Sequence, residues 1–476
     1  MTRQQISSLK KAVGAANISD RPVTLKKYSG DAWYASSMPD VVAMPRHTAQ
    51  VQQLVRFAQR NQIPITPRGA GRGYVGGCVP VQGGILLSLH RMNRILEIST
   101  PDSVAVVQPG VITAELQQAV LRRKLYYPPD PASLKESSIG GNIATNAGGP
   151  RCLKYGVTGA YVLGLETVLM NGDIVRTGGR THKNKVGFKL HDLFVGSEGM
   201  LGIITEATLR LIPAPPARAG LVATFKNAKS AVAVVSAIQR AGLIPCALEV
   251  ADSFTLHAAR KYNPATPQGN AFILTELDGQ RTSVKNELKL LKQLVNKYHP
   301  LTLKTATTEQ QVEGLWDMRR DFSYGLRATG LTKLNEDVTV PRSHLLDLFA
   351  FAARLQKETG MELACFGHAG DGNIHVNIML PREKADSSEA HRALDRLFET
   401  VISWNGAITG EHGVGLAKKK WWTRAVSPEL HRLHCSVKNA LDPDNLLNPG
   451  KFLNPEDQFE VVMDPARLTS PPPRRH

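Results

Sequence analysis

The sequence predicts a mixed helix-and-strand protein built from at least two domains. From Val41 onward, segments with helical spacing of apolar residues alternate with short apolar segments that are typical of strands. Pro213-Ala-Pro-Pro216 interrupts this alternation and marks the clearest domain boundary in the chain. Three glycine-rich loops precede that boundary, at residues 67–74, 137–149 and 196–202. At roughly 150 residues per domain, 476 residues correspond to about three units or two large ones.

The individual elements follow from spacing and from residues that cap or break them. One helix begins at Thr48, which can cap it, and another runs from the capping residue Thr113 to about Lys124. Beyond the boundary, helix and strand signals recur to about residue 400, and the first 38 residues form an N-terminal segment. Apolar or alternating segments predict strands at 63–67, 85–89, 104–107 and 203–211, and a further helix is predicted around 427–441.

Composition excludes several classes of protein. Hydrophobic residues make up 42% and charged residues 21%, which is typical of a globular chain. No stretch approaches 18 uninterrupted apolar residues, and the polar N-terminus does not resemble a secretory signal. The five cysteines are widely spaced without Cys-x-x-Cys, which argues against a disulfide scaffold, a structural zinc site and a cysteine-held iron–sulfur cluster. We therefore expect a cytoplasmic protein.

The charge balance favours anionic partners. Lys and Arg outnumber Asp and Glu by 58 to 41, which gives a net charge of +17. Such a surplus suits small acids, nucleotides, phospholipid headgroups or nucleic acid. Because the chain has no Lys/Arg-rich run and no basic motif with interleaved aromatic residues, we do not expect nucleic acid as the ligand.

The glycine-rich loops share a signal for a ligand laid against the backbone. In Pro67-Arg-Gly-Ala-Gly-Arg-Gly-Tyr74, alternating glycines can bring N–H groups close to a diphosphate. This loop lacks the Lys-Ser/Thr of a phosphate loop and does not open a helix as a dinucleotide fingerprint would. The loop at 137–149 combines glycines with amide and hydroxyl side chains, and the loop at 196–202 leads directly into a strand. Each loop alone could be a plain turn, but three in this order favour a ligand site.

Two histidines in the segment 365–379 are predicted to lie together. Asp371-Gly372 between apolar stretches predicts a two-residue hairpin turn. That turn places His368 opposite His375, and opposed side chains have Cβ atoms about 4.5–5.5 Å apart, which suits two ligands of one ion. Alternation puts His375 and Asn377 on one face of the strand. A hydrogen-bonded pair of core histidines is the alternative explanation.

A second segment, Thr409-Gly-Glu-His-Gly413, places an acid beside a base between glycines. Glu411 together with the two histidines would make a three-ligand nitrogen and oxygen set with an open position, as in catalytic divalent-metal sites. Zn²⁺ or Mn²⁺ suits such a set. The alternative is a surface turn that carries a solvated pair of side chains.

Together these motifs closely resemble the FAD-linked oxidase family of the vanillyl-alcohol oxidase and p-cresol methylhydroxylase type. The resemblance covers about residues 35 to 455. It is strongest for the branch of D-lactate dehydrogenase, the glycolate oxidase FAD subunit and D-2-hydroxyglutarate dehydrogenase. The matching segments are 41–45, 67–77, 129–133, 138–149, 154–156, 196–205 and 448–451.

The resemblance implies an α+β fold. Its parts are a two-part FAD-binding domain of p-cresol methylhydroxylase type, an inserted α/β substrate (cap) domain and a C-terminal helical segment that returns to the flavin. Some relatives attach FAD through a histidine in the first loop, where this chain has Arg72, so the resemblance implies non-covalent FAD. The expected divisions are an N-terminal segment at 1–38, the FAD-binding domain at 39–213, the cap domain at 214–425, the C-terminal segment at 426–460 and a disordered tail at 461–476.

The resemblance also implies residue roles. His368, His375 and Glu411 are the expected ligands of a divalent metal, Zn or Mn, with His412 as the catalytic base and Asn377 as a substrate contact. The residues expected to bind FAD lie mostly in the three loops: Arg68, Gly69, Ala70, Gly71, Arg72, Gly73, Pro131, Ser138, Gly141, Asn142, Thr145, Gly148, Gly199, Ile204 and Asn448.

An arginine should hold the substrate carboxylate, because a planar guanidinium matches a carboxylate with two parallel hydrogen bonds. Arg319 takes the place of the family's substrate arginine, and Ser323 lies one helical turn further on and could share its face. A solvated helical arginine is the alternative. Hydroxyglutarate-type relatives carry a lysine where this chain has Asn335, which favours a small monoacid substrate, although Lys333 could compensate.

The expected function is FAD-dependent, metal-assisted oxidation of a small D-2-hydroxy acid, D-lactate or glycolate, to the 2-oxo acid. Electrons would pass to an external acceptor: a quinone, a cytochrome or an iron–sulfur partner subunit. A cytoplasmic enzyme with peripheral contact at the inner membrane face fits this expectation. The alternatives are a D-2-hydroxyglutarate-type dehydrogenase, a His-His-Glu metal-dependent hydrolase without flavin, and a non-catalytic basic binding module.

Overall fold

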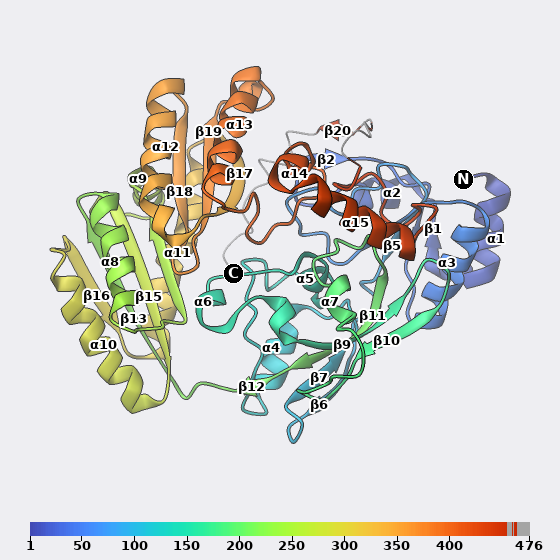
Figure 1. The fold of residues 1–476 in the computed structure, drawn as a ribbon, viewed down its shortest axis with the longest axis horizontal. Helices are drawn as coiled ribbons and strands as arrows, with labels where there is room; N and C mark the ends of the chain where they lie inside the picture. Colours follow the sequence, from blue (N-terminus) through green and yellow to red (C-terminus); the bar gives the residue numbers. More distant parts are fainter. Residues whose placement is uncertain (455–458, 460, 464–476) are drawn as a thin grey trace. The chain divides into compact units, whose positions relative to one another are not determined.

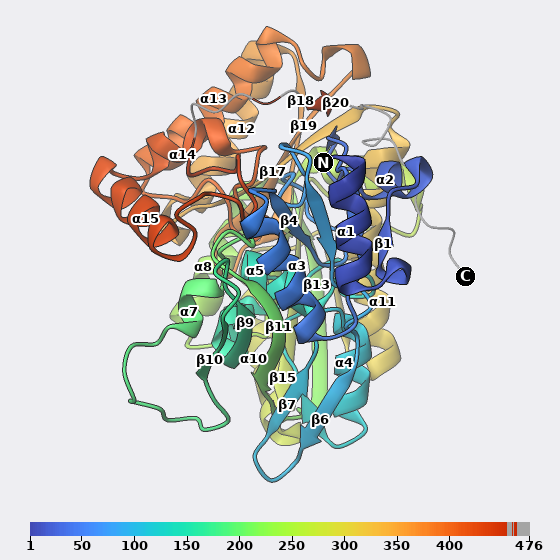
Figure 2. The same cartoon turned by 90° about the vertical axis from the view of Figure 1, so that its right-hand side faces the viewer.

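The computed structural model describes residues 1–454, 459 and 461–463. The chain divides into two compact units, each built from separate stretches of sequence, and Figures 1 and 2 show their elements from two directions. Unit 1 contains residues 1–148 and 157–214 and the described residues from Glu411 on. Unit 2 contains residues 149–156 and 215–410. Residues 411–425, expected in the cap domain, therefore lie in unit 1.

Unit 1 begins with a small sheet of short, mostly buried strands. Helices α1 (Arg3–Val13) and α3 (Thr48–Arg60) bury their apolar faces in the same core as these strands. Leu9 and Val13 of α1 belong to that core, so the first residues are an integral part of the unit. The strand order is β1 (Ile18–Ser19), β3 (Val41–Ala43), β5 (Ile85–Ser88) and β4 (Ile65–Arg68), with β3, β5 and β4 parallel.

A five-stranded antiparallel sheet follows in unit 1. Its order is β10 (Ile174–Gly178), β9 (Val162–Val168), β11 (Ile203–Arg210), β7 (Val104–Val107) and β6 (Ile95–Ser99). The other elements are α2 (Pro22–Tyr28), β2 (Ala35–Ser36), α4 (Thr113–Leu121), β8 (Leu125–Tyr126), α5 (Ile139–Thr145), α7 (His191–Phe194), β12 (Ile212–Pro213), α14 (Lys419–Ala425), α15 (Pro428–Leu441) and β20 (Val462–Met463). The strands expected at 85–89, 104–107 and 203–211 and the helix expected around 427–441 are confirmed to within one residue.

The two expected helix caps are wrong, although both helices form. Thr48 and Thr113 are the first residues of α3 and α4, so neither occupies the capping position before the helix. Their hydroxyls make tertiary contacts instead: Thr48 Oγ1 donates to Glu166, and Thr113 Oγ1 lies 2.9 Å from Ser137 Oγ. The two hydroxyls therefore bond to side chains from other segments of the chain, and not to the helix ends that the sequence predicted.

Unit 2 is a seven-stranded antiparallel sheet covered by helices on both faces (Figure 1). The strand order is β16 (Thr302–Ala306), β13 (Ala217–Phe225), β15 (Ala271–Gly279), β14 (Ala247–Ala251), β18 (Glu362–His368), β19 (Asn373–Leu380) and β17 (Thr332–Thr339). Helices α8 (Ala228–Arg240), α10 (Arg281–Asn296) and α12 (Leu345–Thr359) pack on one face, and α9 (Ser253–Tyr262) and α11 (Glu309–Ala328) on the other. The unit also contains the α-helices α6 (Cys152–Tyr155) and α13 (Ser388–Ser403).

Residues 149–156 belong to unit 2 because their side chains pair with its sheet. Arg151 Nη2 lies 2.9 Å from the buried carboxylate of Glu276. Lys154 and Tyr155 both donate to the side chain of Asp278. Residues 149–156 therefore lie in unit 2, although the sequence places them within the expected FAD-binding domain at 39–213.

The tail expected to be disordered lies mostly outside the described residues. Only residues 461–463 of the range 461–476 are described, and they include β20, which pairs antiparallel with β2. No helix in the described part of the chain is long and apolar enough to cross a membrane.

A buried ion pair supports the turn that carries Asn448. Lys438 Nζ donates to Asp442 Oδ2 at 2.5 Å and to the carbonyl oxygens of Met200 and Leu447 at 2.9 and 2.7 Å. Asp442 is fully buried, and its carboxylate also accepts from the N–H of Leu447. The pair therefore connects α15 with the residues that precede Asn448.

We expect Asp442→Ala to lower the free energy of unfolding by about 3–5 kcal/mol, because Lys438 would remain buried without its counter-charge. Urea denaturation measures this change. Glu429 forms an exposed ion pair with Arg432, so Glu429→Ala serves as the control and should change stability little. Equal effects of the two substitutions would show that the backbone carbonyls alone satisfy the ammonium group of Lys438.

Candidate active site

The histidine hairpin forms, but in a different register from the expected one. Phe366, not His368, lies opposite His375, so the turn contains the four residues 369–372. Gly372, at φ +85°, closes it by donating its N–H to the carbonyl of His368 at 3.1 Å. Because the shift is two residues, both histidines still share one face of the sheet, and their ring centroids are 5.6 Å apart.

The third expected metal ligand, Glu411, belongs to unit 1, whereas His368 and His375 belong to unit 2. Glu411 directly follows Gly410, whose N–H donates to the buried carboxylate of Asp337 at 2.7 Å. Asp337 lies opposite His375 in the β17–β19 pair, so the backbone next to Glu411 is tied to the histidine strand. Two imidazoles and a carboxylate fit a divalent cation with an open coordination position.

Glu249 on β14 connects the histidine site to Arg319. Glu249 Oε1 lies 2.5 Å from Nδ1 of His368, and Oε2 accepts from Arg319 Nε at 2.7 Å. Burial raises the pKa of Glu249, but the charges and hydrogen bonds of these two partners outweigh it and lower that pKa to about 2. Carboxylates commonly orient metal-binding histidines through such a contact at one ring nitrogen.

Arg319 has part of its guanidinium available for a ligand. Its guanidinium carbon lies 4.6 Å from the ring centroid of Phe366. Glu249 takes the Nε–H, whereas Nη1 and Nη2 have no hydrogen-bond partner among the described residues. The outer edge of the fork can therefore bind a carboxylate. Ser323 lies four residues later on α11, as expected for a shared helix face.

Asn377 and its neighbours form a polar strip on the same face as the histidines. Asn377 is fully buried, and its Nδ2 donates to two backbone carbonyls. Its Oδ1, like that of Asn335 opposite, has no hydrogen-bond partner in the part of the chain that the structure describes. Lys333, which lies two residues before Asn335 on β17, is half-buried. Burial and the charges of two nearby arginines lower the pKa of Lys333 to about 8.

The three glycine loops meet within unit 1. Ser138 Oγ accepts from the N–H of Ala70 at 3.1 Å, which joins the first loop to the second. Gly69 comes so close that a Cβ there would lie 2.5 Å from Ser138 Oγ. The N–H of Glu198 donates to the carbonyl of Ala144 at 2.7 Å, which joins the third loop to the second.

Asn448 joins the same group of loops from the C-terminal segment. At φ +46°, it donates its Nδ2 to the carbonyls of Gly77 and Glu198 at 2.9 and 2.7 Å. Its Oδ1 is buried and lacks a hydrogen-bond partner among the residues described. This oxygen could therefore accept a hydrogen bond from a ligand beside the loops. Arg72 pairs with Glu136 at the surface. The other expected FAD residues also lie in unit 1, and their contacts with FAD stay a prediction: Arg68, Gly71, Gly73, Pro131, Gly141, Asn142, Thr145, Gly148, Gly199 and Ile204.

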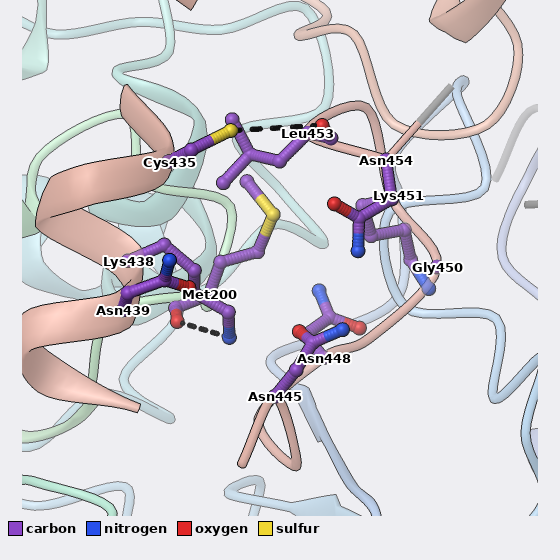
Figure 3. Close-up of a pocket in the computed structure, with 10 residues that line it drawn as sticks. All are labelled: Met200, Cys435, Lys438, Asn439, Asn445, Asn448, Gly450, Lys451, Leu453 and Asn454. Carbon is purple, nitrogen blue, oxygen red and sulfur yellow. Dashed lines mark hydrogen bonds between the residues drawn. The ribbon is translucent and has the colours of Figure 1, made fainter. Parts of the chain in front are cut away.

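A cavity of about 130 Å³ lies beside Asn448, between α15 and the loop at 445–454 (Figure 3). Lys451 and Asn448 come from the loop, and Lys438 comes from α15. A cavity of this volume has room for a few water molecules. It contains none of the metal-ligand candidates.

Three buried carboxylates were not expected from the sequence. Glu249 sits alone in the apolar strand Ala247–Ala251, and such an isolated acid is the signal that could have identified it. Asp337 and Glu198 fix the backbone on either side of Glu411 and His412, through hydrogen bonds to residues 409–410 and 414–415.

Known proteins match nearly the whole chain. Residues 39–178 match the FAD binding domain, and residues 214–452 match the family described as FAD linked oxidases, C-terminal domain. The chain is 38% identical over 468 residues to the glycolate oxidase subunit GlcD of Bacillus subtilis, covering 98% of this chain and 100% of that protein. It is 33% identical over 434 residues to a D-lactate dehydrogenase of Anaerostipes hadrus, covering 88% and 91%.

A solved structure of p-cresol methylhydroxylase with substrate bound matches 96% of this chain and 98% of its own, with a TM-score of 0.79 and 19% identity. This match confirms the expected fold of p-cresol methylhydroxylase type. The matches give no support to the flavin-free hydrolase. Because two family domains match consecutive parts of the chain and relatives above 30% identity cover nearly all of it, the chain belongs to the FAD-linked oxidase family.

Proposed function

We propose that this chain oxidises a small D-2-hydroxy acid, of the D-lactate or glycolate kind, to the 2-oxo acid. The observation that carries the proposal is Glu249, whose carboxylate contacts both His368 of the metal-ligand set and Arg319. A 2-hydroxy acid carries its hydroxyl and carboxylate on adjacent carbons, so a cation at the histidines and a nearby arginine suit the two groups. The relatives named as a glycolate oxidase subunit and a D-lactate dehydrogenase support the same substrate class.

The residues of this chain bind, orient and deprotonate the substrate in the proposed reaction. Arg319 pairs with the carboxylate, and Asn377 and Ser323 are further substrate contacts. His412 accepts the hydroxyl proton as general base. His368, His375 and Glu411 hold a divalent cation, Zn or Mn. When bound, FAD would serve as the hydride acceptor for Cα, and the cation would act as a Lewis acid at the hydroxyl.

The electrons are proposed to leave to an external acceptor: a quinone, a cytochrome or an iron–sulfur partner subunit. The Bacillus relative is named as a subunit, which supports a partner chain. The net charge of +17 suits an acidic partner or peripheral contact with the anionic inner face of a membrane in the cytoplasm. Reoxidation of substrate-reduced enzyme by a quinone analogue and by cytochrome c compares these acceptors.

A 2-hydroxy diacid of the hydroxyglutarate type is the second candidate substrate. Lys333 favours it, because this half-buried lysine lies near enough to Arg319 for that charge to contribute to its lowered pKa. A panel of D-lactate, glycolate and D-2-hydroxyglutarate with an artificial electron acceptor tests the choice. The monoacids should give the higher kcat/KM, and a preference for the diacid would overturn the monoacid assignment.

The flavin is expected to be non-covalent, because the first glycine loop carries Arg72 and no histidine. Acid precipitation of the purified protein should release the yellow colour into the supernatant. Colour that stays with the fully denatured pellet would contradict the expectation.

We expect Arg319→Lys to raise KM about 10- to 100-fold with normal flavin content, because lysine keeps the charge but loses the fork. Arg320→Lys is the matched control, since the neighbouring Arg320 is half-exposed and pairs with Asp317 on the helix surface. Steady-state kinetics on both variants decide the matter. An unchanged KM in Arg319→Lys would move the carboxylate site, with Lys333 as the next candidate.

Glu411 and His412 are neighbours to which the proposal gives different roles. Glu411→Gln should lose metal and activity, and added metal should restore part of that activity because both histidines remain. His412→Gln should keep metal and FAD but reduce flavin about 10²- to 10⁴-fold more slowly, since the proton acceptor is lost. Metal analysis and stopped-flow flavin bleaching measure both effects. Metal loss in His412→Gln with metal retained in Glu411→Gln would reverse the assignment.

A further inference from the structure

Glu198 of the third glycine loop binds the backbone that follows His412. Its Oε1 accepts from the N–H of Val414 at 2.7 Å, and its Oε2 accepts from the N–H of Gly415 at 2.8 Å. Glu198 is buried, so neither bond competes freely with water. One carboxylate thus fixes the two residues that lie two and three positions after His412.

Glycines allow this close approach. A Cβ on Gly413 would lie 2.8 Å from Glu198 Oε1, and a Cβ on Gly415 would lie 2.3 Å from the carbonyl oxygen of Val75. The two glycines have φ values of +86° and +50°, which other residues rarely adopt. The carbonyl of Val75 also accepts from the N–H of Leu416 at 2.7 Å, so the residue directly after the first glycine loop holds the same segment.

The backbone of Glu198 is itself fixed, although its φ of +50° is unusual for a residue with a side chain. Its N–H donates to Ala144 of the second loop, and its carbonyl accepts from Asn448 Nδ2, both at 2.7 Å. The carboxylate therefore has a defined place relative to the loops that are expected to hold FAD.

We propose that Glu198 is a positioning residue that fixes His412 relative to the glycine loops. The inference rests on the proposed function, in which His412 is the base. The ring of His412 lies against that of Tyr74, with centroids 5.2 Å apart, but this contact restrains only the side chain. Glu198 restrains the backbone next to His412, and that backbone sets the position of the imidazole. A displacement of a catalytic group by about 1 Å can slow an enzymatic step about 100-fold.

Glu198→Gln tests the inference, because the amide keeps the size but its nitrogen cannot accept an N–H. Burial raises the pKa of Glu198 to about 7, opposed by the two N–H bonds, so measurements at pH 8.5 compare the variant with an ionised carboxylate. Stopped-flow reduction of the flavin by D-lactate or glycolate should slow about 10- to 100-fold. The substrate concentration that gives half-maximal rate, the flavin content and the metal content should change little.

Glu166→Gln is the matched control. Glu166 is a buried carboxylate of the same unit, where it contacts Thr205 and Arg176. We expect this variant to lower thermal stability and leave the rate of flavin reduction near that of the unmodified chain. Equal slowing in both variants would show a general structural effect and overturn the positioning role.

The double variant Glu198→Gln/His412→Gln separates this inference from the proposed function. If Glu198 acts through His412, the double variant should be no slower than His412→Gln alone. Losses that multiply, or a normal rate in Glu198→Gln beside an impaired His412→Gln, would overturn the inference and leave the base assignment intact. A normal rate in His412→Gln would instead overturn the proposed function. Should Glu198→Gln fail to fold, Gly413→Ala disturbs the same contact from the other side and should give the same slowing.

Discussion

The buried carboxylate of Glu249 links the histidine hairpin to α11 within unit 2. An ionised carboxylate without exposure is stable only when positive charge and hydrogen bonds replace its water. His368 and Arg319 supply both, one from the neighbouring strand and one from α11. Arg319 uses only its Nε–H on Glu249, so the outer edge of the guanidinium has no hydrogen-bond partner among the described residues. The interaction that stabilises the buried carboxylate also fixes the orientation of His368 and Arg319.

Two further buried carboxylates give the segment around Glu411 and His412 a defined backbone. Asp337 accepts from the N–H of Gly410 within unit 2, and Glu198 accepts from two N–H groups just after His412 within unit 1. The proposed metal ligand and the proposed base are therefore consecutive residues in a short stretch held at both ends. A carboxylate can accept several N–H groups at once, which makes it suited to holding an irregular loop.

The glycine loops show the complementary principle, in which absent side chains permit contact. Gly69 lies where a Cβ would collide with Ser138, and the backbone of Glu198 reaches Ala144 and Asn448. Small residues bring the loops together, and Asn448 Oδ1 beside them has no hydrogen-bond partner among the described residues. Membership of the FAD-linked oxidase family gives this arrangement its cofactor, and the loops supply the backbone against which that cofactor can lie.

The sequence by itself determined the residue types and the faces of the site. Strand alternation placed His375 and Asn377 together, and that remained true after the register moved, because a shift of two residues preserves the face. The turn length was decided by the hydrogen bond from Gly372, which a dipeptide signal could not foresee. The roles of Thr48 and Glu249 were decided by partners far away in sequence, 118 residues for Thr48 and 119 and 70 residues for Glu249. Local pattern reports periodicity and propensity, whereas the partner of a buried polar group is chosen by tertiary packing, which brings distant segments to within hydrogen-bond distance.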